Sequence, residues 1–307
     1  MKHLRTLLDL TADEIYEILE LSLELKAKFQ KGDRPPLLQG RVLAMLFEKP
    51  SLRTRNSFEA AVMHLGGGGI FLSTQEAGLN GRESLADIAR VLSSYTDAIA
   101  MRTFSQQLIE EFATHSRCPV INGLSDDSHP CQALTDLLTL QEVFGDLNGR
   151  KLVFIGDGNN IACSLAIAAS ILKIPMTLCT PPNYSISAEV QSELQRRFPD
   201  AEVSHCSDPA EAVRDAGVVY TDVWASMGQE SEADTRRKKF APYQVNQALM
   251  ATAPKSCKFM HDLPAHRGEE VTDEVIDGPN SIVFQQAENR MHLAKGLLVW
   301  LINGGRG

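Results

Sequence analysis

The feature that most constrains the fold of this 307-residue chain is a repeated alternation of short apolar segments with longer helical ones. Short apolar strands that alternate with helices favour a parallel sheet covered on both faces. In the first series we predict strands at 42–47, 70–73, 98–103 and 119–122, and helices near 54–64, 84–94, 106–114 and 130–144. A capping box at Thr11 and Glu14 predicts one further helix ahead of this series.

A second series of the same kind begins after the polar turn at 146–149. It predicts strands at 151–156, 176–180, 202–205, 218–222 and 257–261, and helices at 159–173, 187–197 and 209–215. A polar insertion at 231–239 precedes the last of these strands, and a final helix is predicted at 287–301. We therefore expect an α/β fold of two doubly wound parallel-sheet domains, 1–146 and 147–286.

The charge and cysteine content disfavour several classes of protein. The net charge of -9 argues against a nucleic-acid partner, because a phosphate backbone requires a basic surface. No apolar stretch approaches the roughly 18 residues of a membrane span, and acidic residues interrupt any N-terminal leader, so we expect a cytoplasmic protein without a membrane partner. The six cysteines lack C-x-x-C spacing, which predicts free thiols in a reducing compartment and neither a zinc site nor a disulfide ladder.

Ligands of open parallel sheets bind beyond the carboxyl ends of the strands, so the residues after each predicted strand are the candidates for chemistry. In the first domain, Ser51 can cap a helix whose N-terminal N–H groups would bind an anion, and residues 53–55 add two guanidinium groups and a hydroxyl. A capped helix with two solvated arginines explains this segment equally well. Arg102 and the segment 129–132 follow two further strands, and each is more often structural when taken singly.

The second domain carries a glycine pair, Gly156 and Gly158, that imitates the start of a dinucleotide fingerprint. Ile161 replaces the third glycine, and no acidic residue follows the strand at 176–180 to hold a ribose, so a nicotinamide cofactor is disfavoured. Asn159 and Asn160 are left as amide donors at a helix N-terminus, where a carboxylate would bind.

Asp222 and Ser226 follow another strand of the second domain. They could bind an ammonium, or equally form a helix cap with a polar loop. The polar insertion behind them could act as a lid. The segment 261–268 leaves the last strand, and Arg290 lies at the start of the final helix.

Three of these segments together resemble the ornithine carbamoyltransferase family, within the aspartate/ornithine carbamoyltransferase superfamily. The motif S-x-R-T-R matches 51–55, H-P-x-Q matches 129–132, and D-x-x-x-S-M-G matches 222–228. The third motif is the most informative, because the related aspartate and putrescine enzymes carry other sequences in that loop. The similarity covers essentially the whole chain in order.

The resemblance implies an enzyme that moves the carbamoyl group of carbamoyl phosphate onto the δ-amine of L-ornithine, giving citrulline and phosphate for arginine biosynthesis. It implies that residues 1–146, completed by the C-terminal helix 287–307, bind carbamoyl phosphate, and that residues 147–286 bind ornithine. It also implies a homotrimer with active sites shared between neighbouring subunits, and no metal or organic cofactor.

The family's site residues fall on matching positions of this sequence. The residues implied to bind carbamoyl phosphate are Ser51, Leu52, Arg53, Thr54, Arg102, His129 and Gln132. The residues implied to bind ornithine are Asn160, Asp222, Ser226, Met227 and Leu263, with Asn160 and the Met227 backbone on the α-carboxylate. The residues implied to act on the reacting groups are Arg102, His129, Asp262 and Arg290.

Two positions depart from the family pattern. The family's H-C-L-P reads H-D-L-P at 261–264, so Asp262 replaces a cysteine that lies against the substrates. In the loop donated to the neighbouring subunit, Gly78 replaces a glutamine that touches the neighbour's carbamoyl phosphate. We expect Asp262 to pair with the amino groups of ornithine; alternatively it turns into solvent or pairs with His266 or Arg267.

Two other functions stay open, of which the first is suggested only by Asp262. One is a carbamoyltransferase for a modified ornithine or another diamine. The other is a degenerate, non-catalytic paralogue that binds carbamoyl phosphate and regulates a partner.

Overall fold

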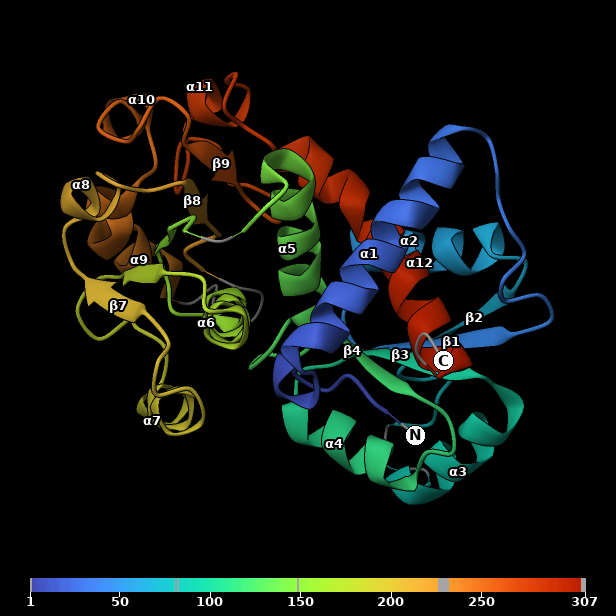
Figure 1. Cartoon of the computed structure of the whole chain (residues 1–307). Coiled ribbons are helices and arrows are strands. Elements are labelled where there is room, and N and C mark those ends of the chain that lie inside the picture. Colours follow the sequence, from blue (N-terminus) through green and yellow to red (C-terminus); the bar gives the residue numbers. More distant parts are fainter. Residues whose placement is uncertain (1, 80, 82, 148, 226–231, 305–307) are drawn as a thin grey trace. The chain divides into compact units, whose positions relative to one another are not determined.

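The computed structural model of the chain describes residues 2–79, 81, 83–147, 149–225 and 232–304 (Figure 1). The chain divides into two compact units. Unit 1 comprises Met1–Val143 and Glu288–Gly307, and unit 2 comprises Phe144–Ala287. No helix among the described residues is both long and apolar enough to cross a membrane.

Unit 1 is built on a four-stranded parallel sheet in the order β2-β1-β3-β4. Its strands are β1 (Val42–Phe47), β2 (Gly68–Ser73), β3 (Ala98–Arg102) and β4 (Val120–Leu124). Its helices are α1 (Ala12–Gln30), α2 (Leu52–His64), α3 (Leu85–Tyr95), α4 (Gln106–His115), α5 (Pro130–Phe144) and, from Glu288 onward, α12 (Val283–Asn303). A short 3-10 turn at Leu7–Asp9 precedes α1.

Helices cover both faces of this sheet (Figure 1). Side chains of α3 and α4 pack on one face in a core with β1, β3 and β4 that includes Ile88, Phe112 and Ile99. The helix α12 contacts α1, α2 and α5, so the end of the chain returns to the first unit. The prediction of two doubly wound parallel sheets with a returning C-terminal helix is therefore confirmed.

Unit 2 contains a five-stranded parallel sheet in the order β7-β6-β5-β8-β9. Its strands are β5 (Leu152–Ile155), β6 (Met176–Cys179), β7 (Val203–Cys206), β8 (Val218–Thr221) and β9 (Lys258–Met260). Its helices are α6 (Asn160–Leu172), α7 (Ala188–Arg197), α8 (Pro209–Ala212), α9 (Ala233–Phe240), α10 (Gln247–Met250) and α11 (Asp273–Ile276), with a 3-10 turn at Ala241–Tyr243.

Each sheet has one point where the chain reverses the direction in which it adds strands. In unit 1 this point lies between β1 and β3, where Phe47 is paired with Arg102. In unit 2 it lies between β5 and β8, where Ile155 is paired with Thr221. Loops leaving neighbouring strands diverge at such points and leave room for a ligand. The two segments richest in candidate residues, 48–55 and 222–228, begin beside these points.

The polar insertion at 231–239 contains a helix that the sequence did not predict. Residues Ala233–Phe240 form the helix α9, and Arg236 in the middle of it is buried. The Arg236 guanidinium donates to the Asp157 carboxylate at 2.8 Å and to the Trp224 carbonyl at 3.0 Å. A strongly polar sequence can still form a packed helix when one long side chain finds a buried counter-charge.

Candidate active site

The first turn of α2 provides an N-terminal anion site at the end of β1. Ser51 caps the helix, because its hydroxyl accepts a hydrogen bond from the Thr54 N–H at 3.2 Å. The cap fixes the first turn, and the remaining N–H groups there lie at the positive end of the helix dipole. The Leu52 side chain is 75% exposed, so this position can contribute its backbone but no packed side chain.

Two guanidinium groups meet at the Thr54 hydroxyl, which is buried. Arg102, from the end of β3, donates to the Thr54 Oγ1 at 3.2 Å, and Arg290, from α12, donates to the same atom at 2.9 Å. Arg290 also donates to the Gln132 side-chain oxygen. Two cations therefore gather beside one neutral hydroxyl, and two guanidinium groups in one place suit the binding of a phosphate dianion.

Residues at the start of α5 complete the cluster in unit 1. The Gln132 amide donates at 2.8 Å to Asp136, which is fully buried and fixes the orientation of the amide. His129 is 2% exposed, and burial first, then Arg290 and Arg102, lower its pKa well below the usual value. The imidazole is therefore neutral at physiological pH, and it can donate a hydrogen bond without carrying a charge.

The neighbouring thiol is excluded as a nucleophile. Burial raises the pKa of Cys131 to about 12, and its Sγ donates to the Asn122 carbonyl at 3.3 Å. A thiol with so high a pKa carries almost no thiolate at neutral pH. Among the described residues around Thr54, the side chains named here are cations and neutral hydrogen-bond donors.

The structure brings six of the residues predicted for unit 1 into this cluster: Ser51, Thr54, Arg102, His129, Gln132 and Arg290. Arg53 lies on the same first turn of α2, with its side chain half-buried. Arg55 does not join it. Its guanidinium pairs with Glu59 at 3.1 Å and lies 3.7 Å from the Phe71 ring, so only one of the two arginines in 53–55 remains a candidate.

The strand-end site of unit 2 has the opposite sign of charge. Asp222, at the end of β8, is 7% exposed and accepts hydrogen bonds from the Asn159 side chain at 2.6 Å and from the Val223 N–H at 2.7 Å. Asn159 is the N-cap of α6, so the helix itself positions Asp222. Burial first, and then Asp262, raise the pKa of Asp222 well above its usual range.

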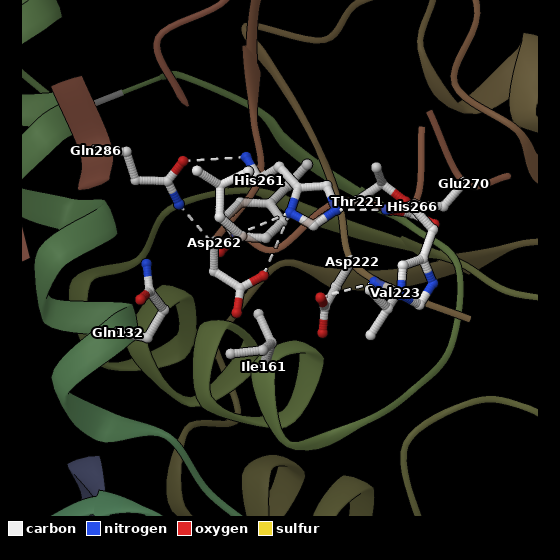
Figure 2. A network of polar contacts seen from close by, with 12 residues as sticks. Gln132, Ile161, Thr221, Asp222, Val223, His261, Asp262, His266, Glu270 and Gln286 are labelled. Carbon is white, nitrogen blue, oxygen red and sulfur yellow. Dashed lines mark hydrogen bonds and ion pairs between the residues drawn. The ribbon is translucent and has the colours of Figure 1, made fainter. Parts of the chain in front are cut away.

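His261 anchors the loop that carries Asp262 (Figure 2). Its Nδ1 accepts from the Leu263 N–H at 3.0 Å, so Nε2 carries the proton and donates to the fully buried Glu270 at 3.1 Å. The His261 N–H donates to Gln286, whose amide in turn donates to the Tyr220 hydroxyl. Leu263 has a φ of 59° and is followed by a cis peptide bond to Pro264, a conformation that these contacts hold.

Asp262 turns neither into solvent nor toward the two alternative partners. Its side chain is 14% exposed, and its carboxylate lies 3.6 Å from the His261 Nδ1. Arg267 instead pairs with Asp273 and Asp277. The His266 imidazole lies 3.9 Å from the Glu269 carboxylate, and the His266 N–H donates to Glu270 at 2.6 Å. The interpretation that Asp262 faces solvent or pairs with His266 or Arg267 is therefore wrong.

Ligand atoms of Asp222, His261 and Asp262 lie within 4.8 Å of one another, a spacing that a metal ion could use. Both ring nitrogens of His261 are already occupied, one by the Leu263 N–H and one by Glu270. The charged oxygens of this group come from the two carboxylates, Asp222 and Asp262. An organic ammonium, which needs acceptors rather than a fixed set of ligands, fits this arrangement better than a transition metal does.

The remaining predictions for unit 2 have different outcomes. Asn160 is the first residue of α6 and follows Asn159, whose amide contacts Asp222, and Leu263 follows Asp262 and donates to His261. Ser226 and Met227 lie outside the described residues. Gly156 has a φ of 137°, and a Cβ at Gly158 would lie 2.2 Å from the Ser185 carbonyl carbon. These glycines are required by the backbone, which explains the fingerprint-like pattern without a nucleotide.

Several positioning residues were missed by the sequence reasoning. Asn159 was expected to donate to a carboxylate of the ligand, whereas its amide nitrogen donates to the Asp222 side chain. Glu270 and Gln286 orient His261, and Asp136 orients Gln132. Only the helical i,i+4 spacing of Gln132 and Asp136 gave a signal that could have been used.

The cationic strand-end site of one sheet suits an anion, and the acidic strand-end site of the other suits an amine. This combination is typical of an α/β enzyme that acts on an anionic and an amino substrate. Comparison with known proteins identifies the family. Residues 2–142 match the profile of the aspartate/ornithine carbamoyltransferase, carbamoyl-P binding domain, and residues 148–301 match that of the Asp/Orn binding domain. The chain belongs to the aspartate/ornithine carbamoyltransferase family and is a carbamoyltransferase.

Individual relatives agree over nearly the full length. The ornithine carbamoyltransferase of Anoxybacillus flavithermus is 51% identical over 303 residues, which are 98% of this chain and 96% of the relative. The anabolic ornithine carbamoyltransferase of Pyrococcus furiosus is 49% identical over 307 residues, with coverage of 99% and 97%. A solved structure of the Pyrococcus furiosus enzyme superposes with a TM-score of 0.94 at 48% identity, covering 100% of this chain and 98% of that one.

Proposed function

We propose that the chain is an ornithine carbamoyltransferase, which transfers the carbamoyl group from carbamoyl phosphate to the δ-amine of L-ornithine and releases citrulline and phosphate. The observation that carries this proposal is the opposite charge of the two strand-end sites, cationic in unit 1 and acidic in unit 2. The full-length similarity to relatives named ornithine carbamoyltransferase, one of them anabolic, supports a role in arginine biosynthesis.

In unit 1, carbamoyl phosphate is bound by the residues around Thr54. The capped first turn of α2, with Ser51, Leu52, Arg53 and Thr54, holds the phosphate together with Arg102. Gln132, fixed by Asp136, binds the carbamoyl amide, and Arg290 extends from α12 to the carbonyl. Two guanidinium groups already assembled on a buried hydroxyl reduce the cost of ordering them when the dianion binds.

The same residues stabilise the reaction's developing charge. When the amine attacks, the carbonyl oxygen of the carbamoyl group becomes an oxyanion, and fixed donors around it lower the barrier. Arg102, Arg290 and the neutral His129 are such donors. A neutral imidazole also avoids repelling the two nearby guanidinium groups.

In unit 2, ornithine is bound through its charged ends. Asp222, with Ser226, accepts from the α-ammonium, while Asn160 and the Met227 backbone bind the α-carboxylate. Leu263, whose conformation is held by His261, contributes its backbone to the amine side. Buried acids without a substrate are held at an energetic cost, and an ammonium that neutralises them is bound correspondingly well.

The assembly and compartment follow from the same proposal. We propose a homotrimer in the cytoplasm, in which the segment around Gly78 reaches a neighbouring subunit. All six cysteines are free thiols, as a reducing compartment would keep them. Sedimentation of the purified chain tests the trimer.

Citrulline formation is the decisive test of the function. Steady-state rates would be compared for ornithine, putrescine, N-acetylornithine and aspartate with carbamoyl phosphate in excess. We expect ornithine to be preferred. A preference for another acceptor would favour the alternative raised by Asp262, and no turnover with any acceptor would indicate a non-catalytic paralogue.

A further inference from the structure

Two of the six cysteines lie opposite each other in the sheet of unit 2. Cys179 is the last residue of β6, Cys206 is the last residue of β7, and the two are register partners in this parallel pair of strands. The Thr180 N–H donates to the Cys206 carbonyl at 3.3 Å, so the pairing continues past them. Among the strands that the structure describes, these two hold the only cysteines.

Both side chains point to the same face of the sheet. Register partners on neighbouring strands carry their side chains to one face, and both cysteines belong to the core cluster that includes Ile155 and Tyr243. Cys179 is fully buried there, and Cys206 is partly exposed at the edge. Burial raises the pKa of the Cys179 thiol, and Cys206 adds to the shift through its charge and a side-chain hydrogen bond. The two thiols are therefore neighbours, one shielded and one open to solvent.

The spacing of the two strands suits a bond between the two sulfur atoms. Neighbouring strands lie about 4.8 Å apart in the hydrogen-bonding direction, and disulfide bonds form where two Cα atoms are about 4.4–6.8 Å apart. A bond between directly paired residues lies near the short end of that range. Because strained or exposed disulfides are easily reduced, the geometry favours a reversible bond over a permanent structural one.

The turn after β7 holds the Cys206 sulfur in place. Its Sγ donates to the Asp208 carbonyl at 3.3 Å and accepts from the Asp208 N–H at 3.4 Å. The Tyr243 hydroxyl donates to the Ser207 carbonyl at 2.9 Å and fixes the same turn from the core side. Cys163, which is also partly exposed, lies on α6 and not in the sheet. Exposure and an opposing thiol therefore coincide at Cys206.

We propose that Cys179 and Cys206 form a site of reversible oxidation, at which a hydroperoxide converts the two thiols into a disulfide between β6 and β7. The inference goes beyond the proposed function and does not depend on it, because neither cysteine is assigned to a substrate. A reducing compartment keeps both residues as thiols until the oxidant is present.

The oxidation has two steps. With hydrogen peroxide, the Cys206 sulfur attacks one peroxide oxygen; an S–O bond forms, the O–O bond breaks, and the thiol proton leaves with the other oxygen as water, which gives a sulfenic acid. The Cys179 sulfur then attacks the Cys206 sulfur; an S–S bond forms, the S–O bond breaks, and the Cys179 proton leaves with the hydroxide as a second water. The two thiols lose two electrons and the peroxide gains them. Since its raised pKa makes thiolate scarce, Cys179 suits the second step rather than the first.

The test exposes the reduced chain to hydrogen peroxide and measures its intact mass without reductant. We expect wild type to lose the mass of two hydrogen atoms, and a thiol reductant to restore the original mass. Trypsin cleaves at 196–197, between the two cysteines, so the bond should join two tryptic peptides. Cys206→Ser should not form it. Cys163→Ser, which alters the other cysteine known to be partly exposed in unit 2, is the matched control and should behave as wild type.

The variant Cys179→Ala isolates the first step. Without the second thiol, Cys206 should stop at the sulfenic acid, which dimedone labels at that residue. Cys206→Ser alters a partly exposed side chain, so the proposal can be tested without the core variant. A bond to a different cysteine, no bond in folded wild type, or dimedone labelling of Cys163 in place of Cys206 would each overturn the proposal, whether or not the chain makes citrulline.

A stability measurement tests whether the folded chain accommodates the bond. The disulfide would close the loop 179–206 and restrict the unfolded chain, so the urea midpoint of oxidised wild type should exceed that of reduced wild type by about 0.5–1 M. Reduction should reverse the shift, and peroxide should leave the midpoint of Cys206→Ser unchanged. An oxidised chain that unfolds at a lower urea concentration than the reduced one would show that the bond distorts the sheet, and it would contradict a built-in site of oxidation.

Discussion

Both units are doubly wound parallel sheets with one reversal point, four-stranded in unit 1 and five-stranded in unit 2, but their strand-end sites carry opposite charge. In unit 1, Arg102 and Arg290 converge on the neutral hydroxyl of Thr54, so positive charge gathers at this strand end. In unit 2, the buried Arg236 donates hydrogen bonds to Asp157 and to the Trp224 carbonyl. The ionisable groups at the neighbouring strand ends are the two acids Asp222 and Asp262. The position of a site follows from the strand order, whereas its chemistry depends on which charges are already paired.

This contrast predicts that removing a buried arginine has different consequences in the two units. Arg236→Met leaves Asp157 buried without its partner, and we expect a loss of about 3–5 kcal/mol in the free energy of unfolding. Urea denaturation measures it. The double variant Arg236→Met with Asp157→Asn should recover much of the loss, because the uncompensated charge is gone. A small effect of the single variant would show that the pair is not the anchor of α9.

Arg53→Ala should affect ligand binding in unit 1 rather than folding. One donor of the phosphate site is lost while the dianion still loses its water, so we expect carbamoyl phosphate binding to weaken by about 2–5 kcal/mol. Arg55→Ala is the matched control, since Arg55 lies on the same helix but pairs with Glu59 and Phe71. Calorimetry with carbamoyl phosphate distinguishes them; equal affinities for wild type and Arg53→Ala would indicate that 51–55 is only a capped helix.

Asp222→Asn tests whether the two sites divide the substrates as proposed. We expect the KM for ornithine to rise by an amount equivalent to about 1.5–3 kcal/mol, the range for a hydrogen bond to a charged group. The affinity for carbamoyl phosphate should stay near that of wild type. If both substrates weakened to the same extent, the assignment of one substrate to each unit would have to be abandoned.

The order and type of the main helices and strands could be predicted from the sequence, because they depend on residues close together in the chain. Caps such as Thr11, Ser51 and Asn159, and short apolar strands between helices, are visible without knowing the fold. Strand ends could likewise be named as places for chemistry. The helix at Ala233–Phe240 was not predicted, because its buried Arg236 depends on a counter-charge at Asp157 that lies 79 residues away in the chain.

The candidate sites show the same limit. Arg290 and Thr54 are 236 residues apart, and no local pattern says that they meet at one hydroxyl. The residues 53–55 alone could not say which of the two arginines would face a phosphate; in the structure Arg55 pairs with Glu59 and lies against the Phe71 ring. Likewise, Asp262 was recognised as unusual, yet its neighbour Asp222 was expected to serve ornithine separately. Pairing between charges is a property of the packed structure, and it decides which groups remain for function.

The smallest expected effect concerns stability as a function of pH. The folded-state pKa of Asp222 is raised, so relative to the unfolded chain this carboxyl favours the folded state at low pH, and that contribution is lost as pH rises through the folded pKa. Asp262→Asn removes one of the causes of the shift. The variant should therefore be more stable than wild type above neutral pH, and the difference should shrink as the pH falls toward the ordinary range of an aspartate. Urea midpoints measured without substrate from pH 4 to pH 8 would test this. A difference that is constant with pH would mean that the substitution changes packing and that the two carboxyl groups do not repel each other.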